Sequence, residues 1–166
     1  MMSTSKEWHR LTEEQQATIL KYQQEIPVKL GLIAKEFGIE VKRATLSANI
    51  SGQIQEKNGK VIIKVNRHDV KARQRYTLSH EISHFLLHRH LLTDGITDDL
   101  LYRSAQSNII EYEAERLAAD IIMPMTQVER LIKKHSETKK GALLLEAIAE
   151  ELEVSTTALG YRIDKK

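Results

Sequence analysis

A histidine-rich stretch at residues 73–90, RQRYTLSHEISHFLLHRH, has the residue types and the spacing of a transition-metal site. His80 and His84 are four residues apart and Glu81 follows the first of them, which gives the pattern H-E-x-x-H. On a helix, residues four apart lie on one face about one turn apart, so both imidazoles can bind one ion. Glu81 is offset by one position and can approach the open side of the ion without binding it. We therefore expect zinc on the two histidines, with Glu81 as the general base that takes a proton from the zinc-bound water as it attacks a peptide carbonyl.

Two further histidines in this stretch, His88 and His90, are weaker candidates for the third ligand. His90 has the offset used by the metzincin pattern, but that pattern needs a glycine three residues after the second ligand histidine, and this chain has Leu87 there. A helix that continues through Leu87 carries both histidines along its axis, away from the ion. We expect them to line or cap the end of the helix, where cationic histidine is favoured.

A second, acidic helix at residues 108–124, NIIEYEAERLAADIIMP, is a better source of the third ligand. Glu111 and Glu115 are four residues apart and flank its apolar stripe, while Glu113 points to nearly the opposite side. One carboxylate of the first pair can bind the metal while the other orients a ligand histidine. The alternative is a solvated acidic face near the start of a helix.

The elements that position these residues follow from the periodicity of the sequence. The segment 42–66 is rich in β-formers, and Asn58-Gly59 within it is a strong signal for a hairpin turn. A capping box at Thr12 opens an early helix, and a second helix ends at Gly38. The pattern therefore predicts an α+β fold: a small antiparallel sheet, the H-E-x-x-H helix, and a mostly helical C-terminal half. The later helices are expected at about 73–90, 108–122, 126–135, 142–152 and 155–162.

Length and composition indicate one globular domain. The chain has 166 residues, of which 41% are apolar and 29% charged, and it contains no linker-like segment. We expect a single metallopeptidase domain over residues 1–166, with a flexible tail at 1–11 and a helix-turn-helix-like subdomain at 142–166. The absence of cysteine excludes thiolate ligands and leaves histidine and carboxylate for a metal. No signal-peptide or membrane-spanning run is visible, which predicts a cytoplasmic protein without a membrane partner.

The combination of RQRYTLSHEISHFLLH with EYEAERLAADIIMP resembles the ImmA/IrrE family of metallo-endopeptidases, found in bacteria, their phages and mobile elements. LIAKEFGIEV, the glycine of ISGQI and the strand IIKVN are similar to the segments that precede the active-site helix in that family. The likeness covers roughly residues 27–163.

The resemblance implies a gluzincin-like site with zinc on two histidines and a glutamate. The family's second motif reads approximately E-x-x-A-N/D-x-F-A-A-x-L-L-M-P, which places the ligand glutamate on Glu111, and Glu113 stays as the alternative. This chain has Glu115 where the family has Asn or Asp, so the hydrogen bond to a ligand histidine comes from a side chain one methylene longer. It also has Leu117 in place of the usual Phe, a substitution within the core.

The resemblance also implies the biological activity, a regulated cleavage of a helix-turn-helix transcriptional repressor that releases stress or mobile-element genes. The substrate is expected to lie extended along an edge of the sheet at 42–66, as in other strand-addition complexes. The segment 91–108 is the expected place for a loop that controls access. Four residues are candidates for stabilising the oxyanion: Tyr76, Tyr102, Arg103 and Tyr112.

A DNA-binding regulator with a structural zinc site is the competing function. The segment LLLEAIAEELEVSTTALGYRI resembles half of a helix-turn-helix, with a turn at Val154-Ser155. Its second helix carries Arg162 as its only basic residue, and Lys165 and Lys166 follow at the end of the chain. Binding to the phosphate backbone normally requires more positive charge on one face. The net charge of +2 does not favour nucleic acid either.

Overall fold

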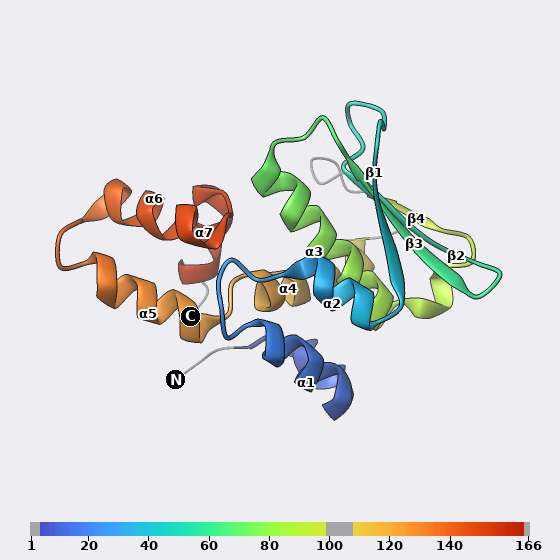
Figure 1. The fold of residues 1–166 in the computed structure, drawn as a ribbon, viewed down its shortest axis with the longest axis horizontal. Helices are drawn as coiled ribbons and strands as arrows, with labels where there is room; N and C mark the ends of the chain where they lie inside the picture. The colour runs from blue at the N-terminus through green and yellow to red at the C-terminus, as the bar shows by residue number, and fades with distance from the viewer. Residues whose placement is uncertain (1–3, 99–107, 165–166) are drawn as a thin grey trace.

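The computed structural model describes residues 4–98 and 108–164, and it confirms the α+β class. Helices make up most of the chain, and a small sheet is formed by residues between the second and fourth of them (Figure 1). The helices are α1 (Glu13–Tyr22), α2 (Leu30–Glu36), α3 (Lys71–Leu87), α4 (Asn108–Ile122), α5 (Met125–His135), α6 (Gly141–Leu152) and α7 (Thr156–Asp164), with short 3-10 turns η1 (Trp8–Arg10) and η2 (Arg89–Leu91). The strands are β1 (Ile39–Ala44), β2 (Gly52–Lys57), β3 (Lys60–Asn66) and β4 (Ile96–Asp98).

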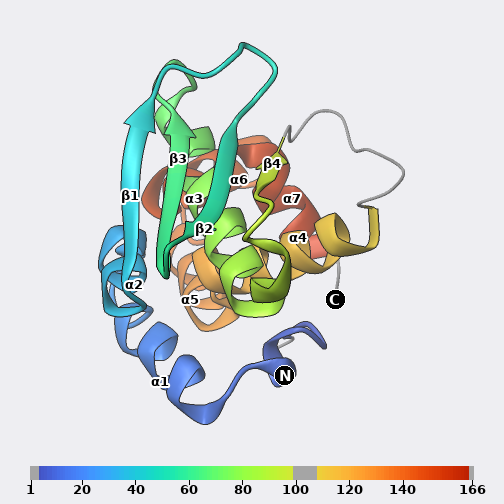
Figure 2. The same ribbon diagram turned by 90° about the vertical axis from the view of Figure 1, so that its right-hand side faces the viewer.

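The sheet is mixed, whereas the sequence predicts an antiparallel one. Its strand order is β1-β3-β2-β4, which Figure 2 shows across the face of the sheet. β2 and β3 form the expected hairpin, with Asn58 and Gly59 both at positive φ in the turn. β1, however, runs parallel to β3 from the Ile39–Val61 pair onward. The hairpin turn determines only the pairing of its own two strands, and the parallel pairing depends on long-range contacts that leave no local pattern.

Helix α3 lies between the sheet and α4, so its side chains are buried from two sides. Ile82 of α3 packs with Ile54 and Ile63 on the inner face of the sheet, and all three are fully buried. Leu117 and Ile121 of α4 belong to the same core. A helix enclosed in this way presents polar residues to a dry interior, and such residues need partners there.

Helices α5, α6 and α7 form the C-terminal part of the fold, to the left in Figure 1. The expected ranges of all later helices are confirmed within a few residues. Ser155 caps α7, because its Oγ accepts a hydrogen bond from the backbone N–H of Ala158 at 3.0 Å. None of the helices within the described residues is long and apolar enough to cross a membrane.

The N-terminal segment differs from the flexible tail predicted for residues 1–11, because residues 4–11 pack against α4. Trp8 lies in the core, and Glu7 is fully buried. The carboxylate of Glu7 accepts two hydrogen bonds, at 2.7 and 2.8 Å, from the guanidinium of Arg116 on α4. This bidentate pair compensates the cost of burying the carboxylate and holds its pKa below the usual value.

Candidate metal centre

The H-E-x-x-H residues lie in the middle of α3, where the helix is covered on both sides. His80, Glu81 and His84 have exposed fractions of 1%, 0% and 0%. The two imidazole rings meet edge to face with their centroids 4.8 Å apart. Helical spacing therefore brings both Nε2 atoms toward one point, as expected for residues four apart.

Glu111 reaches this point from the first turn of α4. Its Oε1 lies 2.9 Å from Nε2 of His80 and 3.1 Å from Nε2 of His84. Glu113, two residues on, contacts neither ring nitrogen of this pair but lies 2.7 Å from Nε2 of His88. Of the two carboxylates that the sequence left as alternatives, the structure brings only Glu111 to both candidate ligand histidines.

Asp98, at the end of β4, is a member of the cluster that the sequence-based hypothesis missed. Its Oδ2 lies 3.1 Å from Nε2 of His84 and 3.5 Å from Nε2 of His80, and the residue is only 3% exposed. One donor atom from each of His80, His84, Asp98 and Glu111 lies within 4.8 Å of the other three. No spacing marks Asp98 in the sequence, because it reaches the site through the long-range pairing of β4 with β2.

Further contacts at the Nδ1 atoms orient the two histidines. Oε1 of Glu115 lies 3.0 Å from Nδ1 of His80, on the side of the ring away from Glu111. Nδ1 of His84 lies 2.9 Å from Nδ1 of His88, whose Nε2 is 2.7 Å from Glu113. His88 therefore continues the row of α3 histidines as a partner of His84, which the sequence-based hypothesis did not anticipate.

These contacts indicate where the protons lie. The carboxylate of Glu113 holds a proton on Nε2 of His88, and burial lowers the pKa of this ring, which favours its neutral form. Neutral His88 then accepts through Nδ1, so the proton between the two rings belongs to Nδ1 of His84. Burial lowers the pKa of His84, but the carboxylates of Asp98 and Glu111 outweigh burial and raise it above its usual value, so they favour a positive charge at its Nε2.

Carboxylates gathered in a buried space require positive charge beside them. Burial lowers the pKa of His80, but the carboxylates of Glu111 and Glu115 outweigh burial and raise it to about 10. The cluster therefore attracts cations strongly. Two imidazole nitrogens with carboxylate oxygens are the donor set that zinc prefers when thiolates are absent, so the residues fit a metal ion.

Glu81 is held against the sheet by the absence of a side chain at Gly52. A Cβ added to Gly52 would lie 2.8 Å from Oε2 of Glu81 and 2.5 Å from Cγ2 of Thr77. Burial raises the pKa of Glu81 well above its usual value, and the carboxylate of Asp98 raises it further. A carboxylate with a raised pKa is a stronger base than an ordinary one, which suits a group that must accept a proton.

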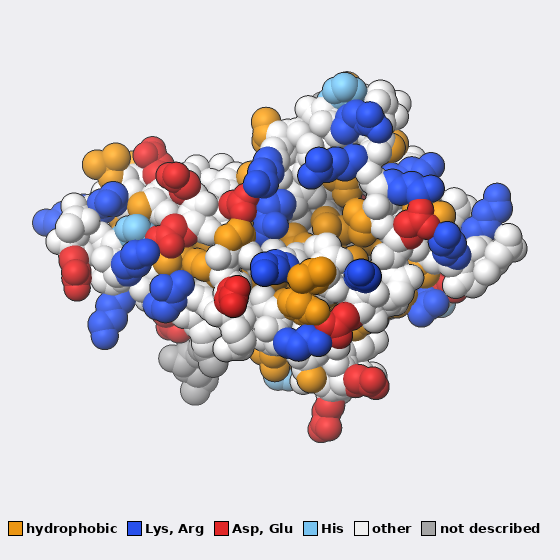
Figure 3. All heavy atoms as spheres, viewed as in Figure 1, with side chains coloured by type: hydrophobic (Ala, Val, Ile, Leu, Met, Phe, Trp, Pro, Cys, Tyr) orange, Lys and Arg blue, Asp and Glu red, His pale blue; other side chains and the backbone are white. Residues whose placement is uncertain are grey.

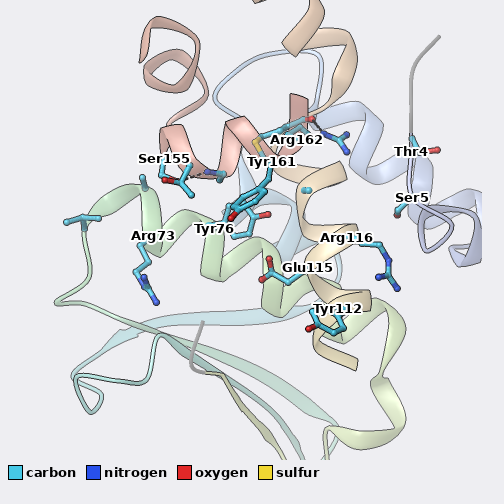
Figure 4. Close-up of a pocket in the computed structure, with 16 residues that line it drawn as sticks. Thr4, Ser5, Arg73, Tyr76, Tyr112, Glu115, Arg116, Ser155, Tyr161 and Arg162 are labelled. Carbon is cyan, nitrogen blue, oxygen red and sulfur yellow. Dashed lines mark hydrogen bonds between the residues drawn. The ribbon is translucent and has the colours of Figure 1, made fainter. Parts of the chain in front are cut away.

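A cavity of about 760 Å³ lies between α3, α4 and α7 and borders this cluster (Figure 4). Glu115 lines the cavity, and its Oε1 lies 3.0 Å from Nδ1 of His80, so this side chain connects the cavity to the metal centre. Tyr76 and Tyr112, two of the candidate oxyanion stabilisers, also line it. The other two candidates, Tyr102 and Arg103, lie outside the described residues.

A comparison with protein-family models places this site in a known context. Residues 34–164 match the family described as the IrrE N-terminal-like domain, a peptidase family. The chain belongs to this family. The match confirms the resemblance seen in the sequence, and it includes α3, α4 and the C-terminal helices in one family unit. No curated protein matches the chain.

For a member of the IrrE N-terminal-like peptidases, the buried cluster is the candidate metal centre of a metallopeptidase. The family match also extends through α6 and α7, the segment that resembles half of a helix-turn-helix. That segment therefore lies within the residues that match the family.

Proposed function

We propose that the protein is a zinc-dependent endopeptidase in which His80, His84 and Glu111 bind the metal and Glu81 is the general base. The observation that carries the proposal is the fully buried carboxyl of Glu81, with a raised pKa, beside a cluster of imidazole and carboxylate donors. Zinc bound by these residues supplies a Lewis acid and lowers the pKa of an attacking water to about 7.

The remaining chemistry belongs to the side chains of this chain. Glu81 accepts a proton from the attacking water as the oxygen bonds to the carbonyl carbon, and it gives that proton to the leaving amide nitrogen as the C–N bond breaks. Glu115 and His88 hold the rings of His80 and His84 by their Nδ1 atoms, which keeps both Nε2 atoms directed at the metal.

The proposed substrate is a helix-turn-helix transcriptional repressor, whose cleavage releases stress or mobile-element genes. Membership of the peptidase family supports a protein substrate, and the resemblance to the ImmA/IrrE proteins supports the repressor. The cavity that Glu115 lines offers space for substrate side chains, and Tyr76, Tyr112 and Tyr161 provide aromatic surface there.

Direct DNA binding by the C-terminal helices is less consistent with the contacts of Arg162. Its guanidinium donates to Oδ1 of Asp120 at 3.0 Å and to the carbonyl of Met123 at 2.9 Å, so it is directed into the fold. The face seen in Figure 3 shows acidic side chains interspersed with basic ones over α5 and α6. Both observations weigh against a basic surface that could neutralise DNA phosphates.

Metal analysis combined with a cleavage assay tests the proposal. The purified protein should contain about one zinc per chain and should cut at least one helix-turn-helix repressor encoded beside its gene. The Glu81→Gln variant should keep its zinc and lose at least about 100-fold in cleavage rate, because general base catalysis contributes about that much or more. Cleavage products would be identified by mass spectrometry.

Glu129→Gln makes the same change of charge at an exposed position on α5 and should cleave at the wild-type rate. A Glu81→Gln protein that retains zinc and remains fully active would refute the role of Glu81. A zinc-independent, salt-sensitive complex with duplex DNA that Glu81→Gln does not affect would favour the regulator instead.

A further inference from the structure

Asp98 has no role in the proposed three-ligand site, although the structure places it inside that site. It is the last residue of β4, is 3% exposed, and directs Oδ2 at both candidate ligand histidines. This Oδ2 is buried without a hydrogen bond of normal geometry, which is costly for a carboxylate. We propose that Asp98 is a fourth protein ligand of the metal, so that strand β4 closes the site in this form of the protein.

The four nitrogen–oxygen separations among the donor atoms are close to those of four-coordinate zinc. With metal–ligand distances of about 2.0–2.2 Å, the ligand atoms of a tetrahedral site lie about 3.3 Å apart. Nε2 of His80 and Nε2 of His84 lie 2.9 and 3.1 Å from Oε1 of Glu111. The same nitrogens lie 3.5 and 3.1 Å from Oδ2 of Asp98. Oδ2 of Asp98 therefore lies within contact distance of both Nε2 atoms, as Oε1 of Glu111 does.

Hydrogen bonds alone do not account for this arrangement. Each Nε2 faces two carboxylate oxygens. An imidazole nitrogen carries at most one hydrogen, so it can donate a well-aligned hydrogen bond to only one of these oxygens. A cation at the centre of the four atoms satisfies all of them at once.

Strand β4 brings Asp98 to the metal along the sheet edge that lies beside Glu81. β4 pairs antiparallel with β2, and Asp98 stands opposite Gly52, the residue whose missing side chain makes room for Glu81. A peptide bound by strand addition at this edge would use the same hydrogen-bonding groups of β2. β4 therefore occupies both the strand position that a substrate would need and the fourth position on the metal.

Four protein ligands make a closed site, whereas a catalytic zinc site keeps one position open for water or substrate. The structure would then represent a latent form, and hydrolysis would require Asp98 to leave the metal. This inference rests on the proposed peptidase function, whose active site it regulates. Within the described residues β1 and β4 are the outer strands of the sheet, so the β2 edge beside Glu81 is covered by β4 in this form.

Cobalt substitution gives a test that does not depend on activity. The visible spectrum of Co²⁺ in the site reports whether a small external ligand can bind, and acetohydroxamic acid would be the probe. The spectrum of the wild-type protein should not change on its addition, whereas that of Asp98→Asn should. Zinc affinity, measured by competition with a chelator, should fall about 10- to 100-fold in Asp98→Asn.

Asp94→Asn removes an exposed carboxylate four residues away and should match the wild type in both measurements. The inference is overturned if acetohydroxamic acid changes the wild-type spectrum as it changes that of Asp98→Asn, or if zinc affinity stays within about threefold of wild type in the variant. Asp98→Ser is a second variant should the first misfold. The contrast between the wild type and the Asp98 variants decides the question, because an unchanged wild-type spectrum alone would also fit a site that is merely buried.

Cleavage assays separate this inference from the function on which it rests. If Asp98 closes an active peptidase, Asp98→Asn at saturating zinc should cleave the repressor faster than the wild type, and Asp98→Asn combined with Glu81→Gln should be inactive. If the protein is no peptidase, neither protein cleaves, yet the contrast in cobalt spectra remains. If Asp98 is no ligand, that contrast is lost while Glu81-dependent cleavage remains.

Discussion

Glu111 and Glu113 are only two residues apart on α4, yet the helix gives them different partners. Glu111 touches Nε2 of both candidate ligand histidines. Glu113 touches His88 and, through Oε2, accepts a hydrogen bond from Arg10 at 2.7 Å. Arg10, Glu113 and His88 therefore form a row of contacts that ends at Nδ1 of His84. The N-terminal segment thus supports the metal centre from a distance.

This arrangement predicts unequal effects for two identical substitutions. Glu111→Gln should lower zinc affinity at least about 100-fold, because it removes a charged ligand from a buried site. Glu113→Gln should lower it by less than about tenfold, since the amide oxygen can still accept from His88. Chelator competition on both variants measures the difference. A loss confined to Glu113→Gln would show that the ligand has been assigned to the wrong carboxylate.

Packing of α3 against β2 determines how Glu81 is presented. The helix approaches the strand so closely at Gly52 that the position accommodates only hydrogen. β2 in turn pairs with β4, so β2 contacts both the proposed general base and the strand that carries Asp98. The geometry of the site is therefore a property of the contact between two elements and not of either one.

Gly52→Ala should consequently disturb both stability and chemistry. The added methyl would lie 2.5 Å from Cγ2 of Thr77 and 2.8 Å from Glu81, and overpacking of this kind costs about 1–3 kcal/mol. Gly31→Ala on α2 is the control, because its Cβ meets nothing within 4 Å and should stabilise the helix by about 0.5–1 kcal/mol. Urea denaturation measures both. Equal stability of the two variants would contradict the close packing of α3 on β2.

Over the whole molecule, α7 and the N-terminal segment meet at one buried carboxylate of α4. Asp120 accepts hydrogen bonds from the N–H and Oγ of Ser5 at 3.0 and 2.6 Å, and from Arg162 at 3.0 Å. The Asp120 side chain is 2% exposed and the Arg162 side chain 11%. Segments from the two ends of the described chain are thereby tied to the helix that carries Glu111.

Arg162→Met should therefore destabilise the fold, by about 3–5 kcal/mol, because it leaves Asp120 as a buried charge without its cation. Lys134→Met removes one partner of a largely exposed ion pair with Glu151 and should change stability by less than about 1 kcal/mol. Thermal and urea denaturation of both variants provide the comparison. A mild effect of Arg162→Met, together with weakened DNA binding, would instead support a contact between α7 and nucleic acid.

The sequence alone predicted the parts of the site that depend on local helix geometry. His80, Glu81 and His84 follow from a spacing of four on one helix, and the pairing of Glu111 with Glu115 follows from the same rule. The hairpin turn at Asn58-Gly59 and the boundaries of the later helices were also predictable, because turn and capping signals are local.

Only the tertiary structure decided the contacts between segments distant in the chain. The parallel pairing of β1 with β3, the docking of Glu7 on Arg116, and the arrival of Asp98 at the histidines all involve residues with no shared periodicity. Such contacts form where two surfaces become complementary after folding, so no local pattern encodes them. The sequence therefore determined the H-E-x-x-H histidines and the chemistry they can perform, and the fold decided which carboxylates surround them.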